Sequence, residues 1–240
     1  MTARRFYVDT ARTYWRWAPY LLILGAAVFI PLGLLDSVVD REFEIHSEDL
    51  DALSDLGGIA LIVAFLAQAV TTLIGEVFYA GAVALALSGG ERTQPPSLGS
   101  VARRLAYGRL ILVDLVFGVG AAVGTILFVV PGIIFFTWFA LAGPVVELEG
   151  AGVRQAFARS RRLVKGRFWT VLLVLLPITL VSEVLADGLI ELIHEAIDTP
   201  VLGDWFAESA SNILLSPFYA VAAVLMTMRF ARADRDEPLR

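Results

Sequence analysis

The sequence contains no cysteine and only two histidines, His46 and His194, in 240 residues. Without cysteine the chain can form no disulfide, no thiolate metal site and no cysteine nucleophile. His194 ends a single Glu-x-x-His pair, whereas di-iron carboxylate proteins use two such pairs with further glutamates inside a bundle. The chain also lacks a G-x-x-x-x-G-K-[ST] phosphate loop, a G-x-S-x-G elbow and an H-E-x-x-H pair. We therefore predict that it is not an enzyme and uses no metal or cofactor.

Charge is also scarce, since only 18% of the residues are charged and 58% are hydrophobic. A soluble domain averages about 25% charged and about 45–50% apolar residues. Lipid is the simpler solvent for this much apolar surface, and a bilayer core about 30 Å thick is crossed by about 20 helical residues. We predict one all-α integral membrane domain over residues 1–240, with outer loops at 36–56 and 187–208. Its six spans are expected at about 17–35, 57–87, 109–130, 132–147, 168–186 and 209–229.

Prolines set two of the predicted helix ends. The uncharged stretch 115–146 is too long for one span, and Pro131–Gly132 lies at its middle, so we place a hairpin tip there. Pro31 is expected to kink or end the first helix near the outer surface. The first span follows four arginines, but its length and the lack of a small-x-small site indicate an uncleaved span rather than a signal peptide.

Lysine and arginine are concentrated in alternate connections between the predicted spans. Segments 1–16, 88–109, 147–167 and 229–240 hold 18 of the 19 basic residues, whereas the two outer loops hold 14 of the 24 acidic residues. Basic residues in short loops remain on the cytoplasmic side of a membrane. We therefore predict that both termini and all four basic segments are cytoplasmic.

A basic pattern, R-R-L-x-x-G-R followed by Leu or Phe, occurs at 103–110 and again at 161–168, each time directly before a predicted span. A weaker copy without the glycine lies at 10–17. We predict three hairpins inserted in parallel, each preceded by a basic interfacial helix, whose apolar face would be buried about 5–10 Å in the headgroup region. The residues expected to contact lipid headgroups are Arg103, Arg104, Arg109, Arg159, Arg161, Arg162, Lys165 and Arg167.

Acidic residues also occur within the predicted spans, where they usually face a partner or water. They are Glu76, Asp114 and Glu183. Glu76 could be a proton or cation site, a protonated acid packed in the interior, or the partner of a basic residue such as Arg109. Gly120 and Gly124 form a G-x-x-x-G pattern, which lets another helix approach closely. The sequence leaves open whether that helix belongs to the same chain or to another subunit.

The run G-V-R-Q-A-F-A-R-S-R-R-L-V-K-G-R-F-W at 152–169 follows V-P-G-I and P-V-V-E-L-E-G. It resembles bacterial six-span proteins related to the membrane domain of glycerophosphoryl diester phosphodiesterases, and similar uncharacterised inner-membrane proteins. The specific similarity covers about 130–169. In fused members of this family the phosphodiesterase activity belongs to a separate soluble barrel, for which these 240 residues leave no room. The resemblance implies a fold and a location in the bacterial inner membrane, and it carries over no catalytic residue.

These features favour a non-enzymatic integral membrane protein, either a scaffold, a regulator or a lipid-interacting module that acts through its basic cytoplasmic helices. One alternative is a transporter or channel for a small solute or ion that uses Glu76 and Asp114. A second alternative is an intramembrane enzyme, for which no catalytic constellation is found. The expected partners are the bilayer and anionic phospholipid headgroups rather than nucleic acid, and a protein partner or homo-oligomer stays open. A polar cavity around Glu76 would favour the transporter, and a dry core would argue against it.

Overall fold

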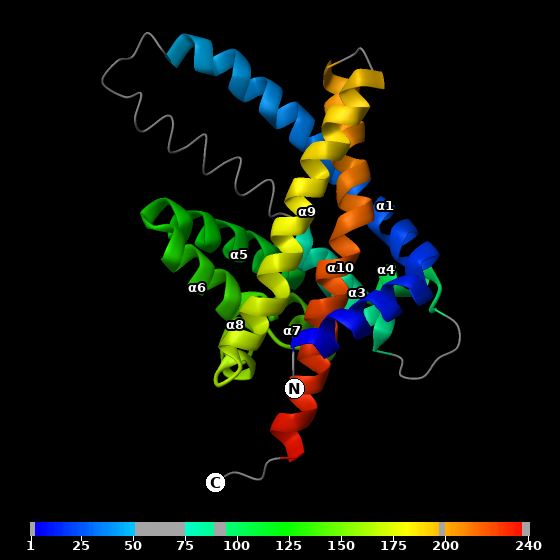
Figure 1. Cartoon of the computed structure of the whole chain (residues 1–240), viewed down its shortest axis with the longest axis vertical. Coiled ribbons are helices and arrows are strands. Elements are labelled where there is room, and N and C mark those ends of the chain that lie inside the picture. Colours follow the sequence, from blue (N-terminus) through cyan, green and yellow to red (C-terminus); the bar gives the residue numbers. More distant parts are fainter. Residues whose placement is uncertain (1–2, 51–74, 89–94, 197–199, 237–240) are drawn as a thin grey trace.

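The computed structural model describes residues 3–50, 75–88, 95–196 and 200–236, and nearly all of them are helical (Figure 1). The helices are α1 (Ala3–Leu50), α3 (Glu76–Leu87), α4 (Leu98–Arg104), α5 (Tyr107–Leu127), α6 (Val129–Phe139), α7 (Ala142–Glu149), α8 (Val153–Val164), α9 (Phe168–Ala196) and α10 (Pro200–Asp236). The described part of the chain contains no strand. The all-α prediction is therefore confirmed for these residues.

Five helices within the described ranges are long and apolar enough to cross a membrane, as in a multi-pass helical membrane protein. They are Ala3–Leu34, Tyr107–Leu127, Val129–Glu149, Phe168–Ile193 and Trp205–Asp236. The third of these comprises α6 and α7 together. Of the predicted span 57–87, residues 57–74 lie outside the described residues and the rest forms the short apolar helix α3. The sixth span therefore stays a prediction.

The two longest helices, α1 and α10, pack against each other in an antiparallel arrangement, and α9 packs on α10. Phe6 of α1 meets the ring of Phe230 at 6.0 Å, whereas Gly33 lies against Ser209 near the other end of the pair. Figure 1 shows both termini at one end of the molecule, and the end of α9 and the beginning of α10 at the opposite end. It also shows α1 crossing the base of the bundle before it turns along α10. The first basic segment, 1–16, is thus continuous with the first apolar helix rather than a separate helix.

Of the two outcomes predicted for Pro31, a kink or an end of the helix, the end is wrong, because α1 continues to Leu50. The Trp205 indole N–H of α10 donates to the Ile30 oxygen at 3.2 Å, so α10 contacts the first helix at this proline. The carbonyl that Pro31 leaves without a donor within the helix is that of Ala27, four residues earlier. Membrane helices tolerate proline, and α1 continues past it. Both predicted outer loops are consequently more helical than expected, with α1 covering residues 36–50 and α9 and α10 covering all of 187–208 except residues 197–199.

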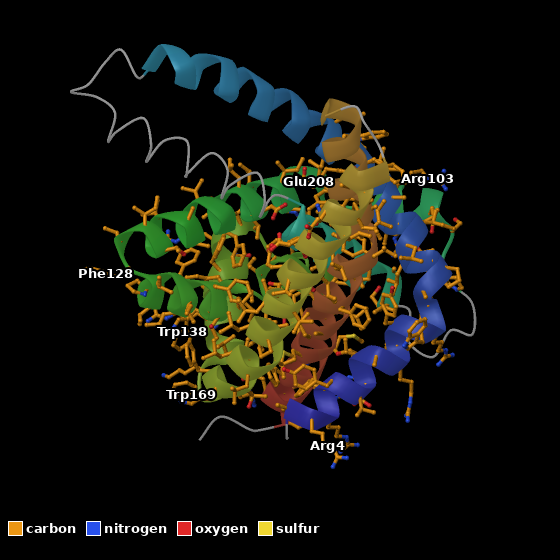
Figure 2. All side chains as sticks on the ribbon, turned by 45° about the horizontal axis from the view of Figure 1, so that its top comes forward. Arg4, Arg103, Phe128, Trp138, Trp169 and Glu208 are labelled. Atoms are coloured by element: carbon orange, nitrogen blue, oxygen red, sulfur yellow. The ribbon has the colours of Figure 1, made fainter. Side chains whose placement is uncertain are left out.

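Helices α5 and α6 form a hairpin that turns at Phe128, three residues before the predicted tip at Pro131. Phe128 has an extended backbone with φ −166°, and α6 begins at the next residue. Pro131 occupies the third position of α6, where a backbone N–H has no acceptor within the helix and its loss is inexpensive. The apolar turn is exposed, with Phe128 at its edge (Figure 2).

The G-x-x-x-G pattern of α5 faces α6 of the same chain, which answers the question that the sequence left open. A Cβ added at Gly120 would lie 2.2 Å from the Phe135 ring. A Cβ added at Gly124 would lie 3.0 Å from the Cα of Gly132. Close approach of backbones gives van der Waals contact, which holds helices together where lipid removes the hydrophobic driving force.

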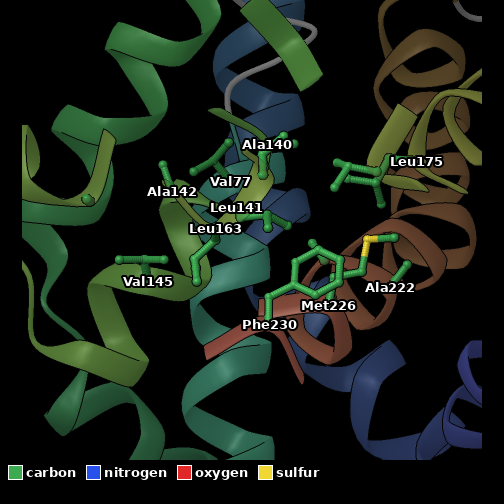
Figure 3. Close-up of a cluster of buried hydrophobic side chains, with 14 of the residues drawn as sticks. Val77, Ala140, Leu141, Ala142, Val145, Leu163, Leu175, Ala222, Met226 and Phe230 are labelled. Atoms are coloured by element: carbon green, nitrogen blue, oxygen red, sulfur yellow. The ribbon is translucent and has the colours of Figure 1, made fainter. Parts of the chain in front are cut away.

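Small residues also let α3 sit at the centre of the bundle, in contact with α7 and α10. Five of its twelve residues are alanine or glycine, and a Cβ added at Gly143 of α7 would lie 2.3 Å from the Val77 oxygen. A buried apolar cluster continues from Val77 through α7 and α8 to Met226 and Phe230 of α10 (Figure 3).

The predicted interfacial helix before the fifth span exists as α8, but its apolar face is covered by protein. Ala156, Ser160, Leu163 and Val164 are buried, and Figure 3 shows Leu163 directed into the cluster beside Leu141. The Ser160 hydroxyl donates to the Trp138 oxygen at 2.8 Å. The expectation that this face lies in the headgroup layer is therefore wrong, since α6, α7 and α10 cover it and only the opposite, basic face is free.

Candidate functional site

Asp114 of α5 holds the beginning of α3. It is 3% exposed, and its two carboxylate oxygens accept hydrogen bonds from the backbone N–H groups of Gly75 and Val77 at 2.6 and 3.2 Å. The first N–H groups of a helix have no acceptor within the helix and favour a negative charge. Gly75 has φ +103°, a conformation that glycine adopts without strain, so the chain can turn sharply into α3 at this point. Asp114 thus caps α3 from a different helix.

Glu76, the first residue of α3, is bound by α10. The Ser216 hydroxyl donates to Oε1 of Glu76. Its other oxygen, Oε2, is buried and has no hydrogen-bond partner among the described residues. The predicted partner Arg109 points elsewhere, because its guanidinium donates to the Gly150 oxygen at 2.8 Å. The Glu76–Arg109 pairing is therefore wrong, and a glutamate–serine contact takes its place.

Glu183, the third acidic residue predicted at membrane depth, is exposed on α9. No hydrogen bond joins it to Glu76 or Asp114, all three of which belong to the described part of the chain. The structure thus brings Glu76 and Asp114 to the start of α3, whereas Glu183 forms no hydrogen bond to either of them.

A cavity of about 660 Å³ lies beside this polar pair, between α1, α3, α4 and α5. Asp114 borders it, but its carboxylate faces the backbone of α3. Otherwise the wall consists of glycine and mostly apolar side chains, and Glu76 is not part of it. Six of the wall residues are Leu24, Val28, Leu32, Tyr107, Ile111 and Leu115. A volume of this size and composition suits an apolar ligand or an acyl chain rather than a hydrated ion.

Two hydrogen-bonding contacts fasten the α4–α5 corner to the α7–α8 corner. The Ala106 N–H donates to the Glu147 carboxylate at 2.8 Å, which caps the beginning of α5. In return, Arg109 donates to the carbonyls of Gly150 and Ala151, at 2.8 and 3.4 Å. Carbonyls at the end of a helix lack donors and attract cations. The two basic helices α4 and α8 are therefore anchored at one place.

Several predicted headgroup residues are exposed on α4 and α8. Arg103 and Arg104 end α4, and neither forms an ion pair within residues 3–50, 75–88, 95–196 and 200–236. Figure 2 shows Arg103 at the edge of the molecule. On α8 and just after it, the exposed basic residues are Arg154, Arg161, Arg162 and Lys165.

Three other predicted headgroup residues have structural contacts. Arg159 binds Glu149 at 2.9 Å and Asp234 at 2.5 Å, which ties α8 to α7 and α10. The Arg159 guanidinium holds the pKa of the exposed Asp234 carboxyl, five residues beyond the predicted last span, below its usual value. Arg167 lies over the Phe230 ring at 5.1 Å, and Arg109 forms the corner contact described above. Arg161 is exposed and also lies over the Trp138 ring.

Sequence reasoning missed the roles of Glu147 and Ser216. Glu147 follows an uncharged stretch and looks like an interface residue, and its capping role depends on a corner 41 residues away. Ser216 lies one residue before Pro217 in α10, and its contact with Glu76 spans 140 residues. Neither contact has a local signal, because both depend on how separate helices pack.

The described residues contain no group of three or more His, Asp or Glu side chains that could hold a metal ion. No family model, curated protein or solved structure matches the chain significantly.

Proposed function

We propose that the protein is a non-enzymatic lipid-interacting module of the membrane, which recruits anionic phospholipid headgroups through the basic helices α4 and α8. The observation that carries this proposal is the burial of one face of α8. Its apolar face is fixed in the protein core, while Arg154, Arg161 and Arg162 stay exposed. Because the helix is held in place, its backbone needs no further ordering when a phosphate binds. Each basic residue near an anionic surface contributes about 1 kcal/mol.

The test uses the full chain reconstituted into bilayers that contain phosphatidylglycerol and phosphatidylcholine, each carrying a spin label in turn. Electron spin resonance measures the preference of the protein surface for the anionic lipid. We expect a clear preference that falls when Arg103, Arg104, Arg162 and Lys165 are all changed to Glu. The matched control changes Arg232→Glu and Arg235→Glu near the end of α10 and should keep most of the preference. An unchanged preference in the fourfold variant would contradict the proposal.

We also propose that the chain crosses the bacterial inner membrane six times with both termini in the cytoplasm, as the charge distribution favours. The absence of native cysteine makes this directly testable. Single cysteines at Ser100 and Ser47 should react with an impermeant maleimide from opposite sides of the membrane. Labelling of both from the same side would contradict the proposed topology.

A proton or cation pathway through Glu76 is the alternative. The buried Oε2 of Glu76, which has no hydrogen-bond partner among the described residues, favours it, whereas the apolar cavity that Glu76 does not line argues against it. An ionisable group inside a membrane is often functional. Proteoliposomes that enclose a pH-sensitive dye would report proton flux driven by a potassium–valinomycin potential. If flux above that of empty vesicles disappears in Glu76→Gln, the transport function is supported instead of the lipid-interacting module.

A further inference from the structure

The cavity beside α3 is elongated and begins at the basic helix α4. On α1 it is lined by Leu24, Val28 and Leu32, and on α5 by Tyr107, Ile111 and Leu115. Each set repeats every four residues, so each row follows one face of its helix over about 12 Å. A basic segment comes before each row in sequence, namely residues 4–16 of α1 and the end of α4. The cavity is therefore an apolar channel that is lined by one face of α1, one face of α5 and helix α4.

The channel opens sideways along α5. Tyr107, Ile111 and Leu115 border it and are still 46%, 55% and 41% exposed, so their side chains have one face in the cavity and another outside the protein. Ala27 of α1 also borders the cavity and is exposed. On apolar helices long enough to cross a membrane, such an opening faces lipid chains. An acyl chain can enter it without leaving an apolar medium.

Helix α4, which forms part of the channel wall, also carries positive charge. Leu98, Ala102 and Leu105 of this helix and its C-cap border the cavity, and Arg103 and Arg104 lie between the last two of them in sequence. Both arginines are exposed and form no ion pair within the part of the chain that the structure describes. The planar guanidinium of arginine matches phosphate geometry and can donate two hydrogen bonds to it. The apolar wall and the two arginines of α4 together fit one molecule that has an anionic phosphate head and an acyl tail.

We propose that this cavity holds one acyl chain of a single anionic phospholipid whose phosphate is bound by Arg103 and Arg104. This inference rests on the proposed function and deepens it, because it assigns one tightly held lipid to a defined site. Bulk enrichment of anionic lipid around the protein needs only exposed cations. A lipid retained through purification needs the cavity as well.

The test counts phospholipids that remain bound when the full chain is moved from phosphatidylglycerol–phosphatidylcholine nanodiscs into mild detergent, by native mass spectrometry. The wild-type chain should retain one phosphatidylglycerol. Ala27→Trp fills the channel and should lose this lipid, as should Ala102→Trp, which fills it from α4. Ile23→Trp is the matched control, because Ile23 is 56% exposed on the same helix and does not border the cavity.

The outcomes test the cavity site and the preference for an anionic headgroup separately. The cavity site is overturned if Ala27→Trp or Ala102→Trp still gives a helical circular dichroism spectrum and retains phosphatidylglycerol. Equal retention of phosphatidylcholine by the wild type overturns the anionic assignment. Arg162→Glu with Lys165→Glu should lower the bulk preference for anionic lipid and leave the retained lipid bound. If Ala27→Trp loses the retained lipid and keeps the wild-type preference for anionic lipid in bilayers, both the cavity site and the proposed function are supported. If only the cavity site is wrong, the preference for anionic lipid in bilayers is still present in the wild type.

Discussion

The corner between α4 and α5 and the corner between α8 and α9 carry the same R-R-L-x-x-G-R pattern, but the chain turns at different places within it. In the first corner α4 ends at Arg104, and the turn occupies Leu105 and Ala106. In the second corner α8 continues two aligned positions further, to Val164, and the turn occupies residues 165–167. The aligned glycines therefore differ, since Gly108 is helical and Gly166 has φ +79°.

The difference shows how one pattern can be stabilised in two ways. The first corner is held from outside, by Glu147 on the Ala106 N–H and by Arg109 on the Gly150 carbonyl. Both corners contain the same backbone hydrogen bond, from the Arg109 N–H to the Ala106 oxygen at 3.0 Å and from the aligned Arg167 N–H to the Val164 oxygen at 2.8 Å. The second corner has the Phe230 ring of α10 as its outside contact, and the Arg167 side chain lies over it. What both corners share is a basic pair at the end of a short helix directly before a long apolar one.

The largest expected effect comes from removing the external cap of the first corner. Glu147→Ala leaves the Ala106 N–H without its acceptor, and an unsatisfied partly buried donor costs about 1–3 kcal/mol. Thermal unfolding in detergent, followed by circular dichroism, should show a clearly lower midpoint. Glu147→Gln keeps an acceptor oxygen and should lose much less. Equal losses in the two variants would mean that the charge, and not the hydrogen bond, holds the corner.

The aligned glycines provide the next test, because a Cβ would meet nothing within 4 Å at either position. Any difference between them therefore comes from the backbone. Gly166→Ala forces a left-handed conformation on a residue with a Cβ and should cost about 1–2 kcal/mol. Gly108→Ala replaces a helical glycine and should stabilise by about 0.5–1 kcal/mol. Unfolding midpoints that shift in the same direction would show that the two corners do not differ as described.

The sequence predicts the elements of these corners better than their contacts. Charge and hydropathy locate α4, α8 and the long helices after them, since basic and apolar runs are local signals. The position of each turn is not predictable, because the two corners share the same sequence pattern. The chain turns according to the contact from elsewhere in the chain, which is Glu147 for the first corner and Phe230 for the second. The same reason explains why Pro31 does not end α1 and why Asp114, expected as a candidate ion site, caps α3. Prediction fails at these positions because helices distant in sequence complete the local structure.

A smaller effect is expected for Arg159, which holds the second basic helix to its neighbours. Arg159→Ala removes the contacts to Glu149 and Asp234, and partly exposed ion pairs typically contribute about 0.2–1 kcal/mol. Arg104→Ala is the matched control in the first basic helix, because Arg104 is exposed and unpaired within the described residues. The unfolding midpoint should fall for Arg159→Ala and stay constant for Arg104→Ala. A fall of the same size in both would show that the contacts of Arg159 add nothing.

The smallest expected effect is a dependence on pH. Arg159 lowers the pKa of Asp234, so the carboxylate stabilises the folded chain above the ordinary aspartate pKa of about 4 and the contribution is lost as the pH falls through the lower, folded value. Because Asp234 is exposed and screened, the change should be slight. The difference in unfolding midpoint between wild type and Asp234→Asn should narrow between about pH 6 and pH 3. A difference that stays constant over this range would contradict the assignment.

The central claim is that both corners present cations to anionic lipid although they are built differently. The most direct test measures the preference for spin-labelled phosphatidylglycerol over phosphatidylcholine in three variants of the reconstituted chain. These are Arg103→Glu with Arg104→Glu, Arg162→Glu with Lys165→Glu, and the combination of all four. The account predicts a partial loss of preference for each pair, a larger loss for the combination, and weaker effects at high salt, which screens charge. A wild-type preference in the fourfold variant would contradict it.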